Sequence, residues 1–174
     1  MSGSTRVLLG DPGSVSALAA TLRSAAVSLA AEAERVGRAR ADLADAPVRV
    51  PVDRRRRTEG VQQTLQATSR VLTESAGALQ HAAADLAEQV AALQRLEDEA
   101  ARRGLQVRDG TVAPAWGITG TVDERTDPQA QEQVREQLER RLHACVSTIG
   151  RCRSRLTREC AQARRTLTEI RRML

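Results

Sequence analysis

The chain has 174 residues, a formal net charge of +5 and 27 basic residues, all of them Arg. Apolar residues make up 41% of the sequence, but Trp116 is the only aromatic residue and alanine dominates the apolar set. A core of small side chains removes little apolar area from water per residue, and each Å² of that area contributes about 25 cal/mol to stability. This composition excludes a large aromatic core, and one domain made of long helices that associate with a partner is expected.

The basic charge is unevenly placed along the chain. Residues 129–174 hold 11 Arg and 5 Glu, whereas residues 1–128 hold 16 Arg and 17 acidic residues. This asymmetry fits an acidic protein partner, a nucleic acid or an anionic surface, and it equally fits a solvated helix face.

The first predicted helix covers residues 12–44. Asp11 provides an N-cap and Pro12 occupies the first helical position, where a missing N–H costs nothing. The helix ends before Pro47. Large apolar residues repeat along it at heptad spacing and predict one buried stripe: Val15, Leu22, Leu29, Val36 and Leu43.

An extended strap is predicted over residues 45–58, where Val alternates with Pro and Arg. Arg54 to Arg57 would oppose the dipole in the first turn of a helix, so the second helix is expected to begin near Thr58. It runs to Arg103 and ends at Gly104. Its heptad stripe comprises Leu65, Leu72, Leu79, Leu86 and Leu93.

The segment 105–127 is predicted to be a linker with a short hairpin within 105–120. Asp109 and Gly110 form a typical hairpin turn between two short apolar runs. Trp116 is expected to be a structural plug that buries its ring against the helices. The alternative is an exposed anchor for a ligand or partner.

The third predicted helix covers residues 128–173 and repeats the Asp-Pro start at Asp127-Pro128. It carries the most regular apolar stripe in the chain, so it is the first place where a partner is expected. The predicted partner-binding residues are Leu138, Leu142, Ile149, Leu156, Leu167 and Ile170.

Together these elements predict an all-α fold, an elongated antiparallel three-helix bundle or coiled coil. The predicted organisation is a helical hairpin over 1–104, the linker over 105–127, and a basic helix over 128–174 that packs on the hairpin. No run reaches the ~20 apolar residues that a membrane-spanning helix needs, so no membrane span is expected.

Residues for catalysis are not recognisable in the sequence. Neither His81 nor His143 belongs to a metal-ligand pattern, and no nucleotide-binding or nucleophile motif occurs. We therefore expect a non-enzymatic protein without cofactors. The three cysteines, Cys145, Cys152 and Cys160, fall on the apolar stripe and are too far apart along one helix to bond to each other. They are expected to pack as free thiols, with an interchain disulfide across a dimer as the alternative.

Arginines cluster in the third helix and support the alternative function, binding to a nucleic acid or an anionic surface. Such binding would act through the phosphate backbone, since aromatic stacking platforms are absent. The predicted basic face comprises Arg151, Arg153, Arg155, Arg158, Arg164 and Arg165.

The run Leu8 to Ala19 that opens an Ala-rich helix, the second Ala-rich helix and the run Gly104 to Val112 together resemble the actinobacterial WXG-like hairpins of type VII secretion. This resemblance covers residues 7–120. It implies a helical hairpin that pairs with another helical chain, and a role as a substrate or companion in secretion. Members export through a tyrosine-based signal, and this chain has no Tyr. The resemblance therefore implies a companion whose partner carries the signal.

The expected function is accordingly a helical protein–protein interaction module that binds a helical partner or forms a homo-oligomer. A cytoplasmic location is expected, because no N-terminal run has the length of a secretory signal. Export through a type VII system together with a partner is the alternative.

Overall fold

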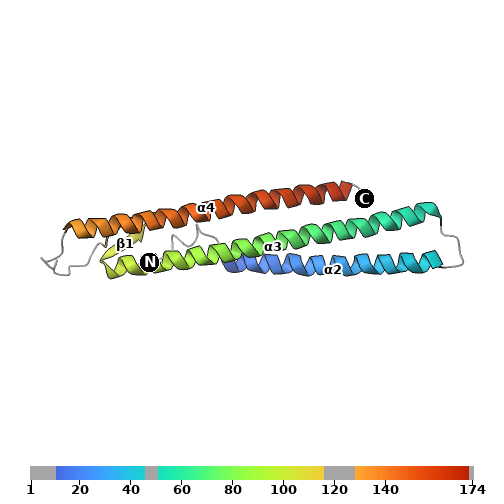
Figure 1. Ribbon diagram of the computed structural model, residues 1–174, viewed down its shortest axis with the longest axis horizontal. Coiled ribbons are helices and arrows are strands. Elements are labelled where there is room, and N and C mark those ends of the chain that lie inside the picture. Colours follow the sequence, from blue (N-terminus) through green and yellow to red (C-terminus); the bar gives the residue numbers. More distant parts are fainter. Residues whose placement is uncertain (1–10, 46–50, 116–127, 173–174) are drawn as a thin grey trace. The chain divides into compact units, whose positions relative to one another are not determined.

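The computed structural model describes residues 11–45, 51–115 and 128–172 (Figure 1). Within these ranges the chain forms three helices, α2 (Pro12–Asp45), α3 (Val52–Arg102) and α4 (Pro128–Arg172), of 34, 51 and 45 residues. A small antiparallel sheet, β1 (Leu105–Arg108) and β2 (Thr111–Pro114), lies between α3 and α4 in the sequence. The prediction of a helical fold is confirmed.

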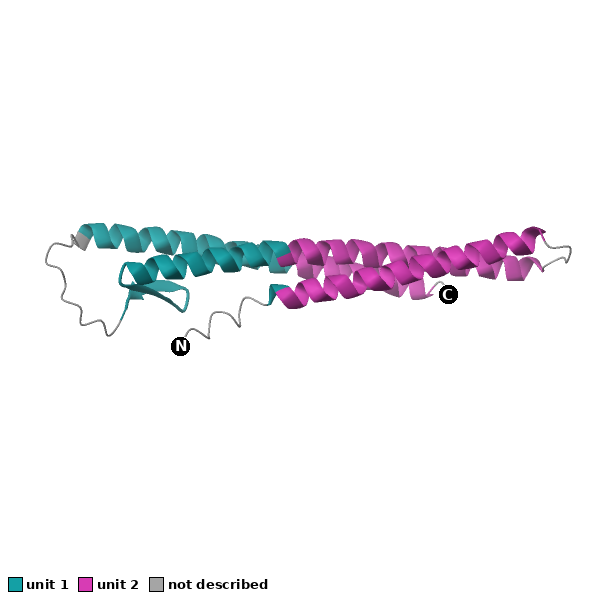
Figure 2. Cartoon of the chain, turned by 90° about the horizontal axis from the view of Figure 1, so that it is seen from below, with its two compact units in different colours: residues 1–12, 84–154 teal, residues 13–83, 155–174 magenta. Residues whose placement is uncertain are grey.

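The chain divides into two compact units, coloured separately in Figure 2. Unit 1 contains residues 84–154, which include the end of α3, the hairpin and the beginning of α4. Unit 2 contains residues 13–83 and 155–174, which include α2, the beginning of α3 and the end of α4. Both α3 and α4 thus contribute a segment to each unit.

Helix α3 begins at Val52, so the prediction of an extended strap up to Thr58 is wrong over residues 52–58. The carbonyl of Pro51 accepts hydrogen bonds from the amides of Arg54 and Arg55 at 3.1 and 3.3 Å, as the residue before a helix does. Asp53 in the first turn offsets the unfavourable charge of the arginines. Arginine is also a good helix former, and these side chains extend into water.

The predicted hairpin is confirmed over residues 105–114. Asp109 and Gly110 have φ of 51° and 81°, the left-handed conformation that a tight hairpin turn requires at both positions. The pair Val107 and Val112 face each other across the sheet, and Val112 is buried. Gly104, with φ of 71°, ends α3 as predicted.

Helices α2 and α3 run antiparallel within unit 2. Near the start of α2, Ser16 Oγ donates to Gln80 Oε1 of α3 at 3.3 Å. Near the end of α2, Arg40 pairs with Glu59, close to the start of α3, at 3.7 Å, so the two helices run in opposite directions. Between these contacts the hydroxyl of Ser69 donates to the backbone carbonyl of Ala26 at 2.8 Å. A short side chain reaches the opposite backbone only where two helices approach closely.

Alanines form the centre of this contact on α2. Ala19, Ala26 and Ala33 are 0%, 1% and 2% exposed, and they are the buried residues of that helix. The prediction that the large aliphatic stripe forms the centre is wrong, because close approach of the backbones displaces larger side chains to the flanks. Val15, Leu22, Leu29 and Val36 are half-buried there, and Leu43 is exposed.

Larger residues build the core of unit 1. Leu96, Leu138 and Leu142 are the largest fully buried side chains of the described residues. The remaining buried residues come from α3, β2 and α4: Leu86, Leu93, Ala100, Val112, Ile149 and Cys152. The hairpin therefore shares a core with the two helices, which an isolated two-stranded ribbon needs for stability.

A larger side chain at the centre of the α2 contact should separate α2 from α3. We expect Ala26→Leu to lower the free energy of unfolding by about 1–3 kcal/mol, because the added methylenes have no space beside the α3 backbone. Thermal denaturation followed by circular dichroism measures the change. Ala20→Leu, at an exposed position of the same helix, is the matched control. Equal effects of the two substitutions would contradict the close contact.

Candidate interaction surfaces

Helix α2 exposes apolar side chains that the other described residues leave uncovered. Leu18 and Val27 are 50% and 65% exposed, and between residues 12 and 31 Arg23 is the only charged residue. Residues advance by about 100° per position, so Leu18, Leu22, Leu29 and Leu43 lie on one flank of α2 and Val27 lies on the opposite flank. We define Leu18 and Leu43, the latter 46% exposed, with the half-buried Leu22 and Leu29, as the α2 apolar face. Contiguous exposed apolar surface of this kind commonly marks an interaction site.

The same helix has the length and composition of a membrane span, and it is the one described helix that does. Core helices of soluble proteins and signal sequences share these properties. Only 11% of its most apolar window is buried within the chain, so α2 is not a fully covered core helix here. Its apolar character therefore remains available to another molecule.

The sequence pattern did not predict the α2 apolar face, because the most regular apolar stripe lies on the third helix. The signal was present, since residues 12–31 contain a single charged residue, whereas 28% of the whole chain is charged. A search for uncharged runs alone passes over this segment, because Arg23 interrupts it. The burial of alanine in place of leucine, which leaves the larger side chains outside, cannot be read from heptad spacing.

The apolar stripe of α4, predicted to bind a partner, packs within the chain. Leu138, Leu142, Ile149 and Ile170 are between 1% and 7% exposed. The other two predicted residues, Leu156 and Leu167, are half-buried. Four of the six side chains are therefore covered within the chain, and binding of a partner by this stripe stays a prediction.

The three cysteines are free thiols in different surroundings. Cys152 is buried and Cys145 is half-buried, in line with the packing role expected for them. Cys160 is exposed, so its predicted place on the buried stripe is wrong. The six residues from 157 to 162 are all exposed, which shows that the covered stripe of α4 is interrupted there.

All six arginines of the predicted basic face are exposed, but they do not share one side of α4. Residues advance by about 100° per position, so Arg151, Arg158 and Arg165 form one line, with Arg155 beside it, while Arg153 and Arg164 lie on another flank. Arg151 donates to the hydroxyls of Ser147 and Thr148 at 3.0 and 2.9 Å.

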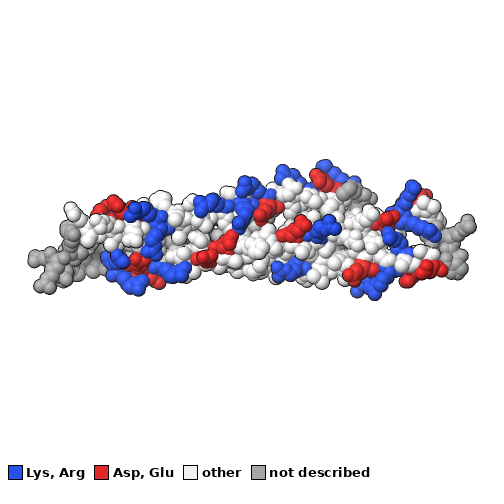
Figure 3. Space-filling view, in the orientation of Figure 1, with Lys and Arg blue, Asp and Glu red and all other residues white. Residues whose placement is uncertain are grey.

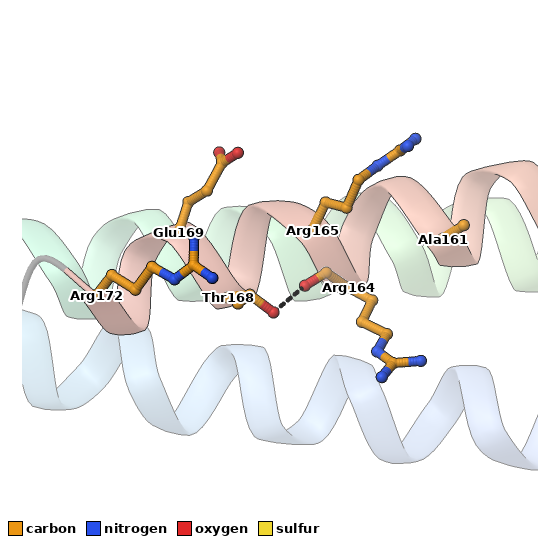
Figure 4. A pocket seen from close by; sticks show the side chains of 6 residues that line it. All are labelled: Ala161, Arg164, Arg165, Thr168, Glu169 and Arg172. Carbon is orange, nitrogen blue, oxygen red and sulfur yellow. Dashed lines mark hydrogen bonds between the residues drawn. The ribbon is translucent and has the colours of Figure 1, made fainter.

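A shallow hollow lies on the last turns of α4 in unit 2 (Figure 4). Arg164 extends there on the side where α2 is drawn, whereas Arg165 and Glu169 extend away from it. The hydroxyl of Thr168 donates to the carbonyl of Arg164 at 2.8 Å. The hollow is lined by Ala161, Arg164, Arg165, Thr168, Glu169 and Arg172.

Ion pairs join α3 to α4 in unit 1. Arg141 Nη1 lies 2.6 Å from Glu99 Oε2, and Arg103 pairs with the other oxygen of the same carboxylate at 3.2 Å. The hydrogen bond from Arg141 is the main reason why the pKa of Glu99 lies below its usual value of 4.5. This carboxylate bridges two helices.

A second cluster lies within α4 near its start. Arg135 donates to both Glu132 and Glu139, one turn before and one turn after it. The hydrogen bond with Arg135 lowers the pKa of Glu132, and the same bond raises the pKa of Arg135. Pairs at this spacing stabilise a helix locally, which is sufficient to explain them.

Basic and acidic side chains alternate over the face of the molecule that Figure 3 shows. The ranges that the structure covers contain no group of three or more His, Cys, Asp or Glu residues able to hold a metal ion. The Nδ1 atom of His143 lies 3.2 Å from the backbone carbonyl oxygen of Glu139, and His81 is exposed. Trp116, the predicted plug, lies outside the described residues.

Comparisons of this chain with protein-family models, with curated proteins and with solved structures find no match.

The Glu99 bridge should make stability depend on pH in a defined direction. Its pKa is lower in the folded than in the unfolded chain, so the bridge stabilises the folded state above pH 4.5 and this contribution is lost as the pH falls through the lowered value. We expect Glu99→Gln to reduce the Tm at pH 7 and to have little effect at about pH 2.

Thermal denaturation of the wild-type chain and of the Glu99→Gln variant between about pH 2 and pH 7 measures the difference in Tm. Glu88→Gln, at an exposed carboxylate of α3 without an ion pair among the described residues, is the control. A loss of Tm at Glu99→Gln that stays constant down to pH 2 would show that the effect comes from packing rather than from charge.

Proposed function

We propose that this chain is a non-enzymatic helical protein interaction module that binds a helical partner through the α2 apolar face. The observation that carries the proposal is the exposure of Leu18 and Leu43 on one flank of a helix whose buried residues are alanines. A partner helix would cover these side chains and the half-buried Leu22 and Leu29 beside them. Burial of such residues is the usual source of affinity between helices.

The arrangement that we propose for the helices is an elongated antiparallel three-helix bundle. The hydrogen bonds between α2 and α3 support the antiparallel pairing of these two. The Glu99–Arg141 ion pair and the buried leucines of α4 support packing of α4 against α3. In this arrangement α2 makes the least extensive apolar contact, which leaves it the most surface for a partner.

The biological setting that we propose is that of a companion in type VII secretion. Support comes from the resemblance to WXG-like hairpins, together with the two Ala-rich antiparallel helices and the exposed apolar face on the first of them. In such a pair each hairpin covers the other's apolar surface, and the partner would carry the export signal. Candidate partners are helical proteins encoded by neighbouring genes.

A nucleic acid or an anionic surface is the alternative ligand, and it rests on the arginines of α4. The mixed charges in Figure 3 give it less support, because polyanions are usually bound by a broad surface of one sign. A lipid surface is a third occupant to test at the α2 apolar face. Calorimetric titration with a helical protein and flotation with lipid vesicles distinguish the protein partner from the lipid surface.

Loss of the two most exposed side chains of the α2 apolar face should weaken the partner complex. We expect Leu18→Gln combined with Leu43→Gln to raise the Kd for a helical protein encoded by a neighbouring gene at least about tenfold, because each buried aliphatic side chain contributes about 1.5–3 kcal/mol. Calorimetric titration of the purified proteins measures the Kd.

The matched control is Val146→Gln, which removes a valine that is 51% exposed on α4. It should leave the Kd unchanged. An equal loss at both sites would contradict the choice of α2. Flotation of the wild-type chain with lipid vesicles, lost in the α2 variant, would replace the helical partner by a membrane surface.

A further inference from the structure

Four arginines of α4 recur at intervals of seven residues, and we define them as the arginine row: Arg151, Arg158, Arg165 and Arg172. Each follows a residue of the covered stripe by two positions. The corresponding residues of the stripe are Ile149, Leu156, Ala163 and Ile170, of which the first and last are buried and the others are half-buried.

A constant offset of two positions fixes where the row lies on the helix. Two residues correspond to about 200° around an α-helix, so every arginine of the row lies opposite the covered stripe. A heptad repeat drifts by about 20° per repeat on a straight helix, and both lines drift together. The row therefore remains on the outer side of α4, with about 10.5 Å between successive residues.

The arginine row is unpaired within the part of the chain that the structure describes. All four side chains are exposed, and none has a carboxylate within ion-pair distance among residues 11–45, 51–115 and 128–172. Arg151 and Arg165 are hydrogen bonded only to neutral side chains one turn before them. These contacts orient the guanidinium groups without neutralising them.

We propose that the arginine row docks an acidic α-helix of another protein, one that carries Glu or Asp at every seventh residue along one side. Two helices that pack side by side keep matching positions in register only if both repeat every seven residues. A helix with carboxylates at this spacing would place one charge opposite each arginine, and guanidinium groups bind carboxylates through two parallel hydrogen bonds. Charge and spacing thus specify the same kind of partner.

Glu169 favours a helix over a nucleic acid as the occupant. It lies four residues after Arg165 and three before Arg172, and Figure 4 shows it extending away from α2 as Arg165 does. A carboxylate within the row would repel a continuous line of phosphates. A helix that carries charges of both signs can accommodate Glu169 by placing one basic side chain opposite it.

A second copy of this chain does not provide the required acidic line. Among the described helices, acidic residues seven positions apart occur only as Glu132 and Glu139, and both are engaged with Arg135. The partner is therefore a different protein. This docking surface is separate from the α2 apolar face, so each proposal can fail without the other.

The test uses the full chain and designed peptides as probes. The first peptide is an alanine-rich helix of about four heptads with Glu at every seventh position, and the second has the same composition with the Glu residues distributed around the helix. Fluorescence anisotropy at about 20 mM salt measures their binding. The wild-type chain should bind the first peptide about tenfold more tightly than the second.

Two quadruple Arg→Gln variants with the same net charge then locate the surface. Substitution of the arginine row should weaken binding of the first peptide about tenfold, since exposed ion pairs contribute little each and four act together. The control replaces four exposed arginines of α2 and α3, at Arg38, Arg56, Arg70 and Arg95, and should change the Kd less than about twofold. Circular dichroism verifies that both variants are folded.

Charge reversal provides an independent measurement. The chain with Arg→Glu at all four positions of the row should bind a peptide with Lys at every seventh position and lose the Glu peptide. Equal weakening by the two Arg→Gln variants, or absence of binding by the Glu peptide at low salt, would overturn the proposal. Tighter binding of a DNA duplex or of anionic vesicles, lost with the row, would identify a polyanion instead.

Discussion

The close contact between α2 and α3 is the constraint on which the surface of this protein depends. The backbone carbonyl of Ala26 accepts a hydrogen bond from the hydroxyl of Ser69 at 2.8 Å, so the two helix backbones approach closely there. At such distances only small side chains fit between the helices. The larger aliphatic residues of α2 are displaced to the flanks and outward, so the same contact that joins the two helices creates the exposed apolar face.

Helix α4 divides its surface differently. Its large aliphatic side chains are used within the chain, as the burial of Leu138 and Leu142 shows, and its outer side carries arginines that the described residues do not neutralise. One chain thus presents an apolar face on α2 and a periodic basic line on α4. The partners proposed for the two surfaces differ in chemistry, because the α2 apolar face is uncharged and the arginine row is made of positive charges.

The sequence predicted the elements better than their packing. Asp-Pro pairs located the start of α2 and α4, and Asp109-Gly110 located the hairpin, because these signals act through local backbone geometry. The predicted start of α3 was wrong. The run of arginines disfavours a first helical turn, but Asp53 in that turn offsets their charge. Heptad spacing could not distinguish alanine from leucine at the centre of a contact, so it did not predict the exposed apolar face of α2.

The alanine contact also bears on how readily α2 separates from the rest of unit 2. Alanine methyl groups bury little apolar area, so local opening of α2 exposes far less to water than opening of the leucine core around Leu138 and Leu142. Backbone amides of α2 are therefore expected to exchange with solvent deuterium faster than those of α4 near residue 140. A helix that opens easily can rearrange around an incoming chain at little energetic cost.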